Sequence, residues 1–313
     1  MTYSIDPIPN RRRKKRTHYS GVFIISMAFL AFIVIGLTVS LSIRACSRHH
    51  NHSQEENRHK ELNTEPVGEK YEIIPEVSLP YEMPDSVVRI CMPRPLEGIS
   101  EQIIRKTSYI VSYNKDTKIS NWVAWHLTAE HTDGPYKRMS NFYEEESVAS
   151  PRATIEDYHG SGWSRGHMCP AGDNKWNEIA MYESFSLVNV CPQNANLNSG
   201  IWNSLEIDCR RWAKQYGEIY IVCGPVFLKQ EHETIGVNQV FVPEAFFKVV
   251  LCLNNTLRGF GLIVRNTDGN RKRDLYYNSI DQVERITGYD FFPALPDELE
   301  DSIESKVDMN LWN

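Results

Sequence analysis

The sequence predicts an α+β domain built on a central antiparallel β-sheet flanked by helices, with a transmembrane helix near the N-terminus. Strand-like apolar runs and amphipathic helical patterns do not alternate regularly, which disfavours a doubly wound parallel sheet. Apolar residues make up 41% of the 313 residues and charged residues 24%, which is typical of a globular protein. Residues 21–43 contain no charged side chain, which predicts the transmembrane helix.

The N-terminal segments differ sharply in charge. Residues 1–20 carry six basic side chains and one acidic side chain, a net charge of +5, so the remainder of this chain of net charge −6 carries −11. Residues 21–43 would span roughly 35 Å as a helix, enough for a hydrocarbon core of about 30 Å. The alternative is a cleaved signal peptide, whose apolar core is usually only about 7–15 residues.

These patterns predict four parts of the chain. They are a basic cytoplasmic tail (1–20), a transmembrane anchor (21–43), a polar linker (44–84) and a folded domain (85–313). Because the basic run precedes the apolar stretch, the N-terminus is expected in the cytoplasm. The sequence therefore predicts a single-pass membrane protein whose folded domain lies outside the cytoplasm, in the periplasm or the extracellular space.

Within the folded domain, the elements are expected in a definite order. Residues 107–127 predict two strands around a turn at Asn114–Lys118, followed by a polar loop over 131–150. Helices are expected over 174–188, over 198–212 with apolar residues at three- and four-residue steps, over 279–287 and over 294–308. Strands are expected within 217–227, 238–253 and 258–266, which are apolar runs separated by Gly, Pro and Asn.

The seven cysteines leave the disulfide pairing open. A translocated domain would meet an oxidising compartment, but the count is odd and sequence alone does not give connectivity. Cys223 and Cys252 lie in apolar runs, which favours small buried side chains. The acidic remainder of the chain also implies that any site for a polyanion is a local basic groove.

Three side chains near the centre of the chain suit phosphate chemistry. His167 follows Arg165 and Gly166, and its imidazole titrates near neutral pH, which suits a general base for water. Arg165 is a candidate for stabilising the charge that grows on a phosphate, and Arg138, in the loop before it, is a second candidate.

Asn198 and Glu206 lie eight residues apart on the expected helix. Eight steps of about 100° return to within about 80° of the start, so both side chains share one broad side. Asn198 offers a neutral oxygen to a hydrated Mg²⁺, and Glu206 offers a carboxylate to the water bound to that ion. The alternatives are a helix N-cap for Asn198 and a solvated helix face for Glu206.

Other catalytic patterns are weak or absent. A zinc site at His167, Cys169 and Cys191 is an alternative, but the spacing matches no common closed zinc pattern. The sequence contains no P-loop, no G-x-G-x-x-G and no G-x-S-x-G string.

The motifs together resemble the sugar-non-specific DNA/RNA endonuclease family, the ββα-metal nucleases that include endonuclease G. The family pattern is D-R-G-H, then N-x-x-P-Q, then L-N-x-x-x-W-x-x-L-E. This chain has Ser164-Arg165-Gly166-His167, then Asn189-Val190-Cys191-Pro192-Gln193, then Leu197-Asn198, Trp202 and Leu205-Glu206. Weaker similarity extends from about residue 97 to 295.

The resemblance implies a role for each matching residue. His167 would be the general base and Asn198 the only protein ligand of Mg²⁺, with Mn²⁺ as an alternative ion. Glu206 would hold metal-bound water, and Asn189 would help to orient the site. Arg165 and Arg138 would contact phosphate. The resemblance further implies an antiparallel sheet with a ββα-metal finger, and cleavage of DNA and RNA without base preference, leaving 5′-phosphates.

The chain departs from the family pattern at Ser164, where the family usually has Asp. Losing that carboxylate removes negative charge near the cation and would shift the pKa of the base or weaken metal binding. This departure keeps a second hypothesis open, a catalytically impaired nuclease that binds nucleic acid at the membrane surface. A hydrolase of another phosphodiester is a third. The sequence also leaves a homo-oligomer open.

Overall fold

The computed structural model describes residues 81–254, 256–268 and 272–313. The tail, the anchor and most of the polar linker predicted above lie outside these residues. Within the described residues, none of the helices combines the length and the apolar character that crossing a membrane requires. The division into a tail, an anchor, a linker and a folded domain stays a prediction.

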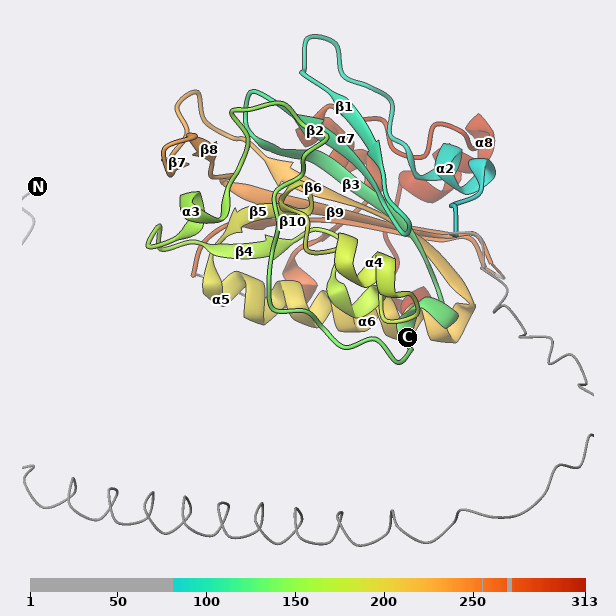
Figure 1. The fold of residues 1–313 in the computed structure, drawn as a ribbon. Coiled ribbons are helices and arrows are strands. Elements are labelled where there is room, and N and C mark those ends of the chain that lie inside the picture. Colours follow the sequence, from blue (N-terminus) through green and yellow to red (C-terminus); the bar gives the residue numbers. More distant parts are fainter. Residues whose placement is uncertain (1–80, 255, 269–271) are drawn as a thin grey trace, which may run out of the picture. The chain divides into compact units, whose positions relative to one another are not determined.

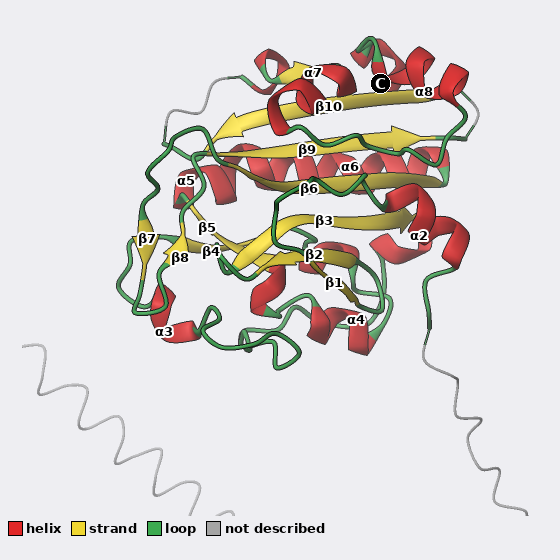
Figure 2. Ribbon diagram, turned by 90° about the horizontal axis from the view of Figure 1, so that it is seen from above, coloured by secondary structure: helices red, strands yellow, loops and turns green. Residues whose placement is uncertain are grey.

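A seven-stranded antiparallel sheet forms the centre of the folded domain (Figures 1 and 2). Its strand order is β1-β2-β3-β6-β9-β10-β11. The strands are β1 (Gln102–Arg105), β2 (Ile110–Asn114), β3 (Ile119–Thr128), β6 (Glu218–Val226), β9 (Ala245–Cys252), β10 (Arg258–Arg265) and β11 (Tyr277–Asn278). Two small hairpins accompany it, β4 (Ser164–His167) with β5 (Val190–Gln193) and β7 (Thr234–Ile235) with β8 (Val240–Phe241).

Helices cover both faces of this sheet, as Figures 1 and 2 show. One face packs against α6 (Asn203–Tyr216) and the β4–β5 hairpin, through a core that includes Trp125, Trp202 and Trp212. The other face packs against α2 (Asp85–Cys91), α7 (Ile280–Thr287) and α8 (Asp297–Glu304). The short helices α3 (Ile155–Tyr158), α4 (Glu178–Glu183) and α5 (Ala195–Leu197) lie in the connections. The domain is therefore a helix–sheet–helix sandwich with two separate cores.

The expected antiparallel α+β architecture is confirmed. The hairpin around Asn114–Lys118 is present as β2 and β3, and the later strands and the two C-terminal helices lie where the apolar patterns predict them. The helix expected over 174–188 is shorter, because the Asn177 side chain caps it at Ala180 N–H and it ends at Glu183. The helix expected to begin at Asn198 begins instead at Asn203, after a π-helical segment in which Gly200 is not helical.

Two glycines of β10 let α7 and α8 lie close to the sheet. A Cβ atom at Gly259 would lie 2.7 Å from Ile280 Cδ1 and 2.8 Å from Ile303 Cγ2. A Cβ atom at Gly261 would lie 2.3 Å from Val283 Cγ2. Because real Cβ contacts do not approach this closely, both positions require glycine for the observed helix packing.

Gly261→Ala is expected to lower the free energy of unfolding by about 1–3 kcal/mol, because the added methyl group overpacks this contact. Urea denaturation of the full chain measures the change. Val283→Ala removes the opposing methyl groups, so the double variant should lose less stability than the sum of the two single variants. Equal unfolding midpoints for Gly261→Ala and the unmodified chain would contradict the packing argument.

Candidate active site

The three motif segments form one unit, a β-hairpin followed by a helical segment (Figure 1). β4 pairs antiparallel with β5, with Ser164 opposite Gln193 and His167 opposite Val190. The chain then passes through α5 and the π-helical segment Asn198–Trp202 into α6. Trp202 Nε1 donates a hydrogen bond to the main-chain oxygen of His167 at 3.4 Å. The segment that carries Asn198 therefore packs directly on the end of β4.

A close approach inside the hairpin explains the glycine of the first motif. A Cβ atom at Gly166 would lie 2.2 Å from Gln193 Oε1 and 2.6 Å from Gln193 Cβ. Gln193 is completely buried, so its side chain has little room to move away. Glycine at position 166 is thus required for the hairpin to close over this side chain.

The His167 imidazole lies between two aromatic rings. Its centroid is 5.1 Å from that of Phe142 and 4.9 Å from that of Phe185, and the residue is only 6% exposed. Burial, helped by the positive charge of Arg138, lowers the pKa of His167 to about 3. Its Nε2 atom is buried and has no hydrogen-bond partner among the described residues. The side chain is therefore a neutral imidazole with a nitrogen available for a proton.

The same two rings support the two predicted phosphate-binding arginines. The Arg165 guanidinium carbon lies 4.9 Å from the Phe142 centroid, and that of Arg138 lies 5.3 Å from the Phe185 centroid. Both arginines are exposed, and neither forms an ion pair with another described residue. With Ser164 they line a cleft of about 450 Å³. His167 does not line this cleft, but its ring contacts Phe142, which does. The structure therefore places the two arginines against the same two rings that flank His167.

Asn198 is available as a ligand and is not a helix cap. The N-cap of α5 is Asn194, whose side chain accepts hydrogen bonds from the main-chain N–H groups of residues 196 and 197. Asn198 is half-buried, and its amide makes no hydrogen bond to another described residue. The N-cap alternative is wrong. The regular 100° count from Asn198 to Glu206 is also wrong, because the π-helical segment intervenes.

Glu206 lies in the first turn of α6, is half-buried and has no hydrogen-bond partner among the described residues. Burial raises its pKa to about 7, and Asp173 adds to that rise, while Lys248, Arg210 and Arg138 oppose it. The alternative of a solvated helix face is therefore wrong. Arg138 lowers the pKa of both His167 and Glu206, so its positive charge lies near both side chains.

Asn189 is completely buried and lies beneath this region. Its amide nitrogen donates to the main-chain oxygens of Cys169 and Ser184, each at 2.8 Å, and its amide oxygen accepts from the Cys169 N–H at 2.8 Å. All of these bonds hold main chain that follows β4 or precedes β5. Asn189 is thus placed to fix the backbone after His167 and does not face the cleft.

The cysteines form neither a zinc site nor a disulfide within the described residues. Six of the seven cysteines are described, and all six are free and buried. Among the described residues, His167, Cys169 and Cys191 do not converge as metal ligands. Burial raises the pKa of Cys209 and Cys223 to about 12, so these thiols stay protonated at neutral pH.

Lys248 on β9 is a residue of the site that the sequence analysis missed. It is completely buried, and its ammonium nitrogen lies 4.4 Å from the Trp202 ring centroid and 5.2 Å from that of Trp125. Its Nζ has no hydrogen-bond partner among the described residues. Burial opposes its charge, but the acidic groups around it, Glu206 and Asp173 among them, raise its pKa. A single lysine inside the apolar run AFFKVVLC was the signal available in the sequence.

Asp173 and Arg210 complete a buried set of four charged groups beneath the cleft. Arg210 Nη1 lies 2.8 Å from Asp173 Oδ1, and Trp125 Nε1 donates to Asp173 Oδ2 at 3.1 Å. Two positive groups, Arg210 and Lys248, thus lie near two carboxyl groups, Glu206 and Asp173. Such a balance offsets the cost of burying each charge.

The fold and the hairpin–helix unit define the class, an α+β protein with a ββα finger. A family model described as DNA/RNA non-specific endonuclease matches residues 91–298. The chain therefore belongs to the DNA/RNA non-specific endonuclease family.

Similar proteins carry names that agree with this family. Mitochondrial nuclease EXOG of Danio rerio is 36% identical over 60% of this chain and 60% of its own length. Mitochondrial endonuclease G of Bos taurus is 34% identical over 64% of this chain and 72% of its own length. A solved structure of an EndoG/EndoGI complex matches with a TM-score of 0.59 and 28% identity, covering 64% of this chain and 89% of that one. The chain spans about 60% of the length of the EXOG relatives it matches.

These relatives correct the localisation expected from the sequence. We expected a single-pass membrane protein with its catalytic domain outside the cytoplasm, whereas the animal relatives are named as mitochondrial nucleases. The expectation rested on residues 1–43, whose charge pattern says nothing about the folded domain that these relatives share. Membrane attachment through residues 21–43 falls outside the described residues and has no support from the structure.

Arg138→Ala is expected to raise the pKa of His167 above about 3, because removing a neighbouring cation favours the charged imidazolium. The Hε1 resonance of His167, followed by NMR between pH 3 and pH 8, measures the change. In the unmodified chain this resonance should not move between pH 5 and pH 8. Arg138→Lys retains the positive charge and should leave the pKa nearer its original value. An unchanged titration in Arg138→Ala would refute the electrostatic coupling.

Lys248→Met is expected to raise the pKa of Glu206 above about 7, because the ammonium group favours the ionised carboxylate. Carbon-13 NMR of the Glu206 carboxyl group measures the midpoint. Lys214→Met, which removes an exposed lysine of the same helix α6, is the matched control and should leave the midpoint in place. A midpoint that stays or falls in Lys248→Met would show that the two groups are not coupled.

Proposed function

We propose that this protein is a metal-dependent endonuclease that hydrolyses phosphodiester bonds of DNA and RNA without base specificity. The observation that carries the proposal is the buried neutral His167 with its unpartnered Nε2. Its ring contacts Phe142, which lines the cleft together with the two exposed arginines. The family is one of metal-dependent nucleases, which supports the same reaction class.

The donor atoms at the finger fit a hydrated hard cation. Asn198 offers an amide oxygen and Glu206 a carboxylate, and neither side chain has a hydrogen-bond partner among the described residues. Oxygen donors of this kind suit Mg²⁺, which keeps most of its water ligands, and Mn²⁺ is the alternative. In the proposal, Asn198 is the direct ligand and Glu206 accepts hydrogen bonds from the bound water. When bound, the cation neutralises charge on the phosphate and on the leaving oxygen.

Protein side chains carry out the remaining steps of the proposed hydrolysis. His167 accepts the proton of the attacking water at Nε2, and its low pKa keeps that nitrogen free of a proton at neutral pH. Arg165 and Arg138 bind phosphate oxygens and stabilise the charge that develops as water attacks. Asn189 holds the main chain after His167 and so orients the imidazole. The two arginines also supply a local positive potential on a chain whose net charge is negative.

Ser164 begins β4 opposite Gln193 and lines the same cleft. It places a hydroxyl group where the family usually has a carboxylate, so the site has one negative charge fewer. We propose that the site remains catalytic, because the base, the direct ligand and the arginines are all present. A homo-oligomer stays a prediction.

Digestion of supercoiled plasmid and of single-stranded RNA by the full chain tests the proposal. Both substrates should be cut with Mg²⁺ and neither with excess EDTA. His167→Ala should slow cleavage by about 10²–10⁴-fold, the usual contribution of a general base. Circular dichroism of each variant checks that it is folded at the assay temperature.

The matched control is His126→Ala, which removes a histidine that pairs with Glu218 and does not line the cleft. It should cut at nearly the original rate. Equal cutting by His167→Ala and the unmodified chain would refute the role of His167. Salt-dependent binding of DNA without cleavage at any divalent metal concentration would instead favour the impaired nucleic-acid-binding protein.

A further inference from the structure

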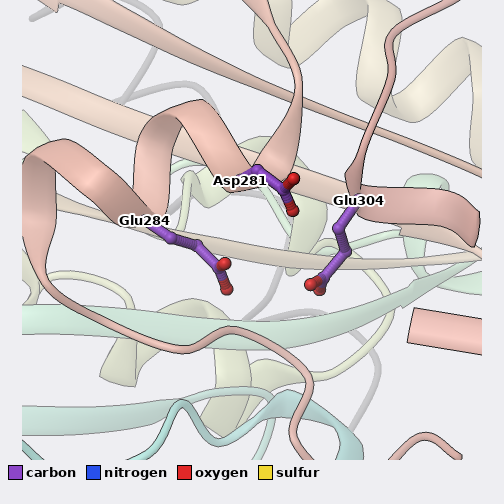
Figure 3. Close-up of side chains that lie close together, drawn as sticks. All are labelled: Asp281, Glu284 and Glu304. Carbon is purple, nitrogen blue, oxygen red and sulfur yellow. The ribbon is translucent and has the colours of Figure 1, made fainter. Parts of the chain in front are cut away.

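A second group of oxygen ligands lies on the opposite face of the sheet from the candidate active site. Asp281 and Glu284 project from α7 toward Glu304 at the end of α8, as Figure 3 shows. One carboxylate oxygen from each of the three residues lies within 4.8 Å of the others. This is the only such group of metal-ligating side chains found among the described residues.

Packing of the core fixes this convergence. Ile280 and Val283, which flank Asp281 and Glu284 in the sequence, are completely buried against the sheet, and Ile303 beside Glu304 is 5% exposed. The two glycines of β10 described above allow both helices to lie this close to the strand. The residues next to the three carboxylates are buried in two packed helices. This packing, and not a surface loop, holds the carboxylates together.

Glu304 supplies a second, independent observation. The residue is only 5% exposed, and its Oε1 is buried with no hydrogen-bond partner among the described residues. An ionised carboxylate that is buried without a partner is costly, so it requires either a proton or a cation. Glu284 differs, because one of its oxygens already accepts the main-chain N–H of Phe291 at 2.8 Å.

The surrounding charges make the cluster strongly acidic. Asp290, Asp297 and Glu300 add further carboxylates, whereas the nearby cations are Arg94 and Arg285. Arg94 is already paired with Asp290 at 2.8 Å. Burial, followed by Glu284, Glu300, Asp281 and Asp290, raises the pKa of Glu304 to about 9.

We propose that Asp281, Glu284 and Glu304 bind a divalent cation of the calcium type, which ties α7 to α8. Ca²⁺ binds oxygen ligands at about 2.3–2.6 Å, so two ligands of one ion lie at most about 4.6–5.2 Å apart. The three oxygens, all within 4.8 Å of one another, are close enough for one such ion to contact them. Each carboxylate can coordinate Ca²⁺ through one or two oxygens. Water molecules can then complete the six to eight oxygen ligands that Ca²⁺ takes. The three ligating side chains include no nitrogen or sulfur donor, which disfavours zinc and copper.

The site is separate from Asn198, because the two lie on opposite faces of the sheet. Its cation therefore stabilises the fold and takes no part in the proposed hydrolysis.

Isothermal titration calorimetry of the full chain with CaCl₂ tests the proposal. The background variant is Asn198→Ala, which removes the proposed ligand of the catalytic metal. This background should still bind one Ca²⁺ and should unfold at a higher temperature with Ca²⁺ than without it.

Glu304→Gln in the same background should weaken Ca²⁺ binding at least tenfold and abolish the thermal shift. It should remain folded without Ca²⁺, because the amide has the same size and carries no charge into this acidic cluster. The matched control is Glu298→Gln, an exposed glutamate of the same helix α8, which should bind as tightly as the background.

Two results would overturn the proposal. One is equal Ca²⁺ affinity with and without Glu304→Gln. The other is no Ca²⁺ binding by the Asn198→Ala background up to millimolar concentrations at pH 7.5. The second result would assign the cluster to carboxyl groups that share protons.

Discussion

The ammonium group of Lys248 is the constraint on which the active-site side of the molecule depends. It projects from a central strand into the core, where no water is available to solvate it. A charge in this position persists only when opposite charges and aromatic faces compensate for its lost hydration. Glu206 and Asp173 provide the opposite charges, and Trp202 and Trp125 provide the faces.

Trp202 connects the Lys248 ammonium group to the proposed base, His167. Trp202 contacts the ammonium group with its ring and donates its N–H to the main chain of His167. The sheet, the finger and α6 are thus linked through one side chain. This linkage explains why a lysine inside a hydrophobic strand stabilises the arrangement, although an isolated buried charge would destabilise it.

The two faces of the sheet carry different distributions of charged side chains. Beneath the cleft, two cations and two carboxylates balance, and additional arginines remain exposed for a polyanion. Between α7 and α8, carboxylates gather with few cations near them. An acidic protein can therefore present a locally positive opening, because its negative charge is concentrated elsewhere.

The sequence predicted most of the architecture because long apolar strands and amphipathic helices have strong periodic patterns. It also predicted the hairpin–helix residues, because the motif fixes their order and spacing. It did not predict β4 and β5 as strands from composition, since Ser164 to His167 and the Pro192 segment lack an alternating apolar pattern. The π-helical turn at Gly200 was invisible, because periodicity assumes a regular helix.

Long-range interactions account for the remaining differences. The low pKa of His167 comes from Phe142, Phe185 and Arg138, which are distant in sequence or lie outside the motif. The convergence of Glu304 with Asp281 depends on the packing of two helices against glycines of β10. Local sequence patterns contain no information about contacts between side chains that are distant in the sequence.

The buried free cysteines have a practical consequence. Six thiols lie in the interior of the described domain, where a bulky aromatic disulfide reagent has no access to them. Their elevated pKa values also keep them in the unreactive protonated form. Labelling of these sulfurs would therefore require the domain to open. The rate of thiol labelling thus reports the local opening and the global unfolding of the domain.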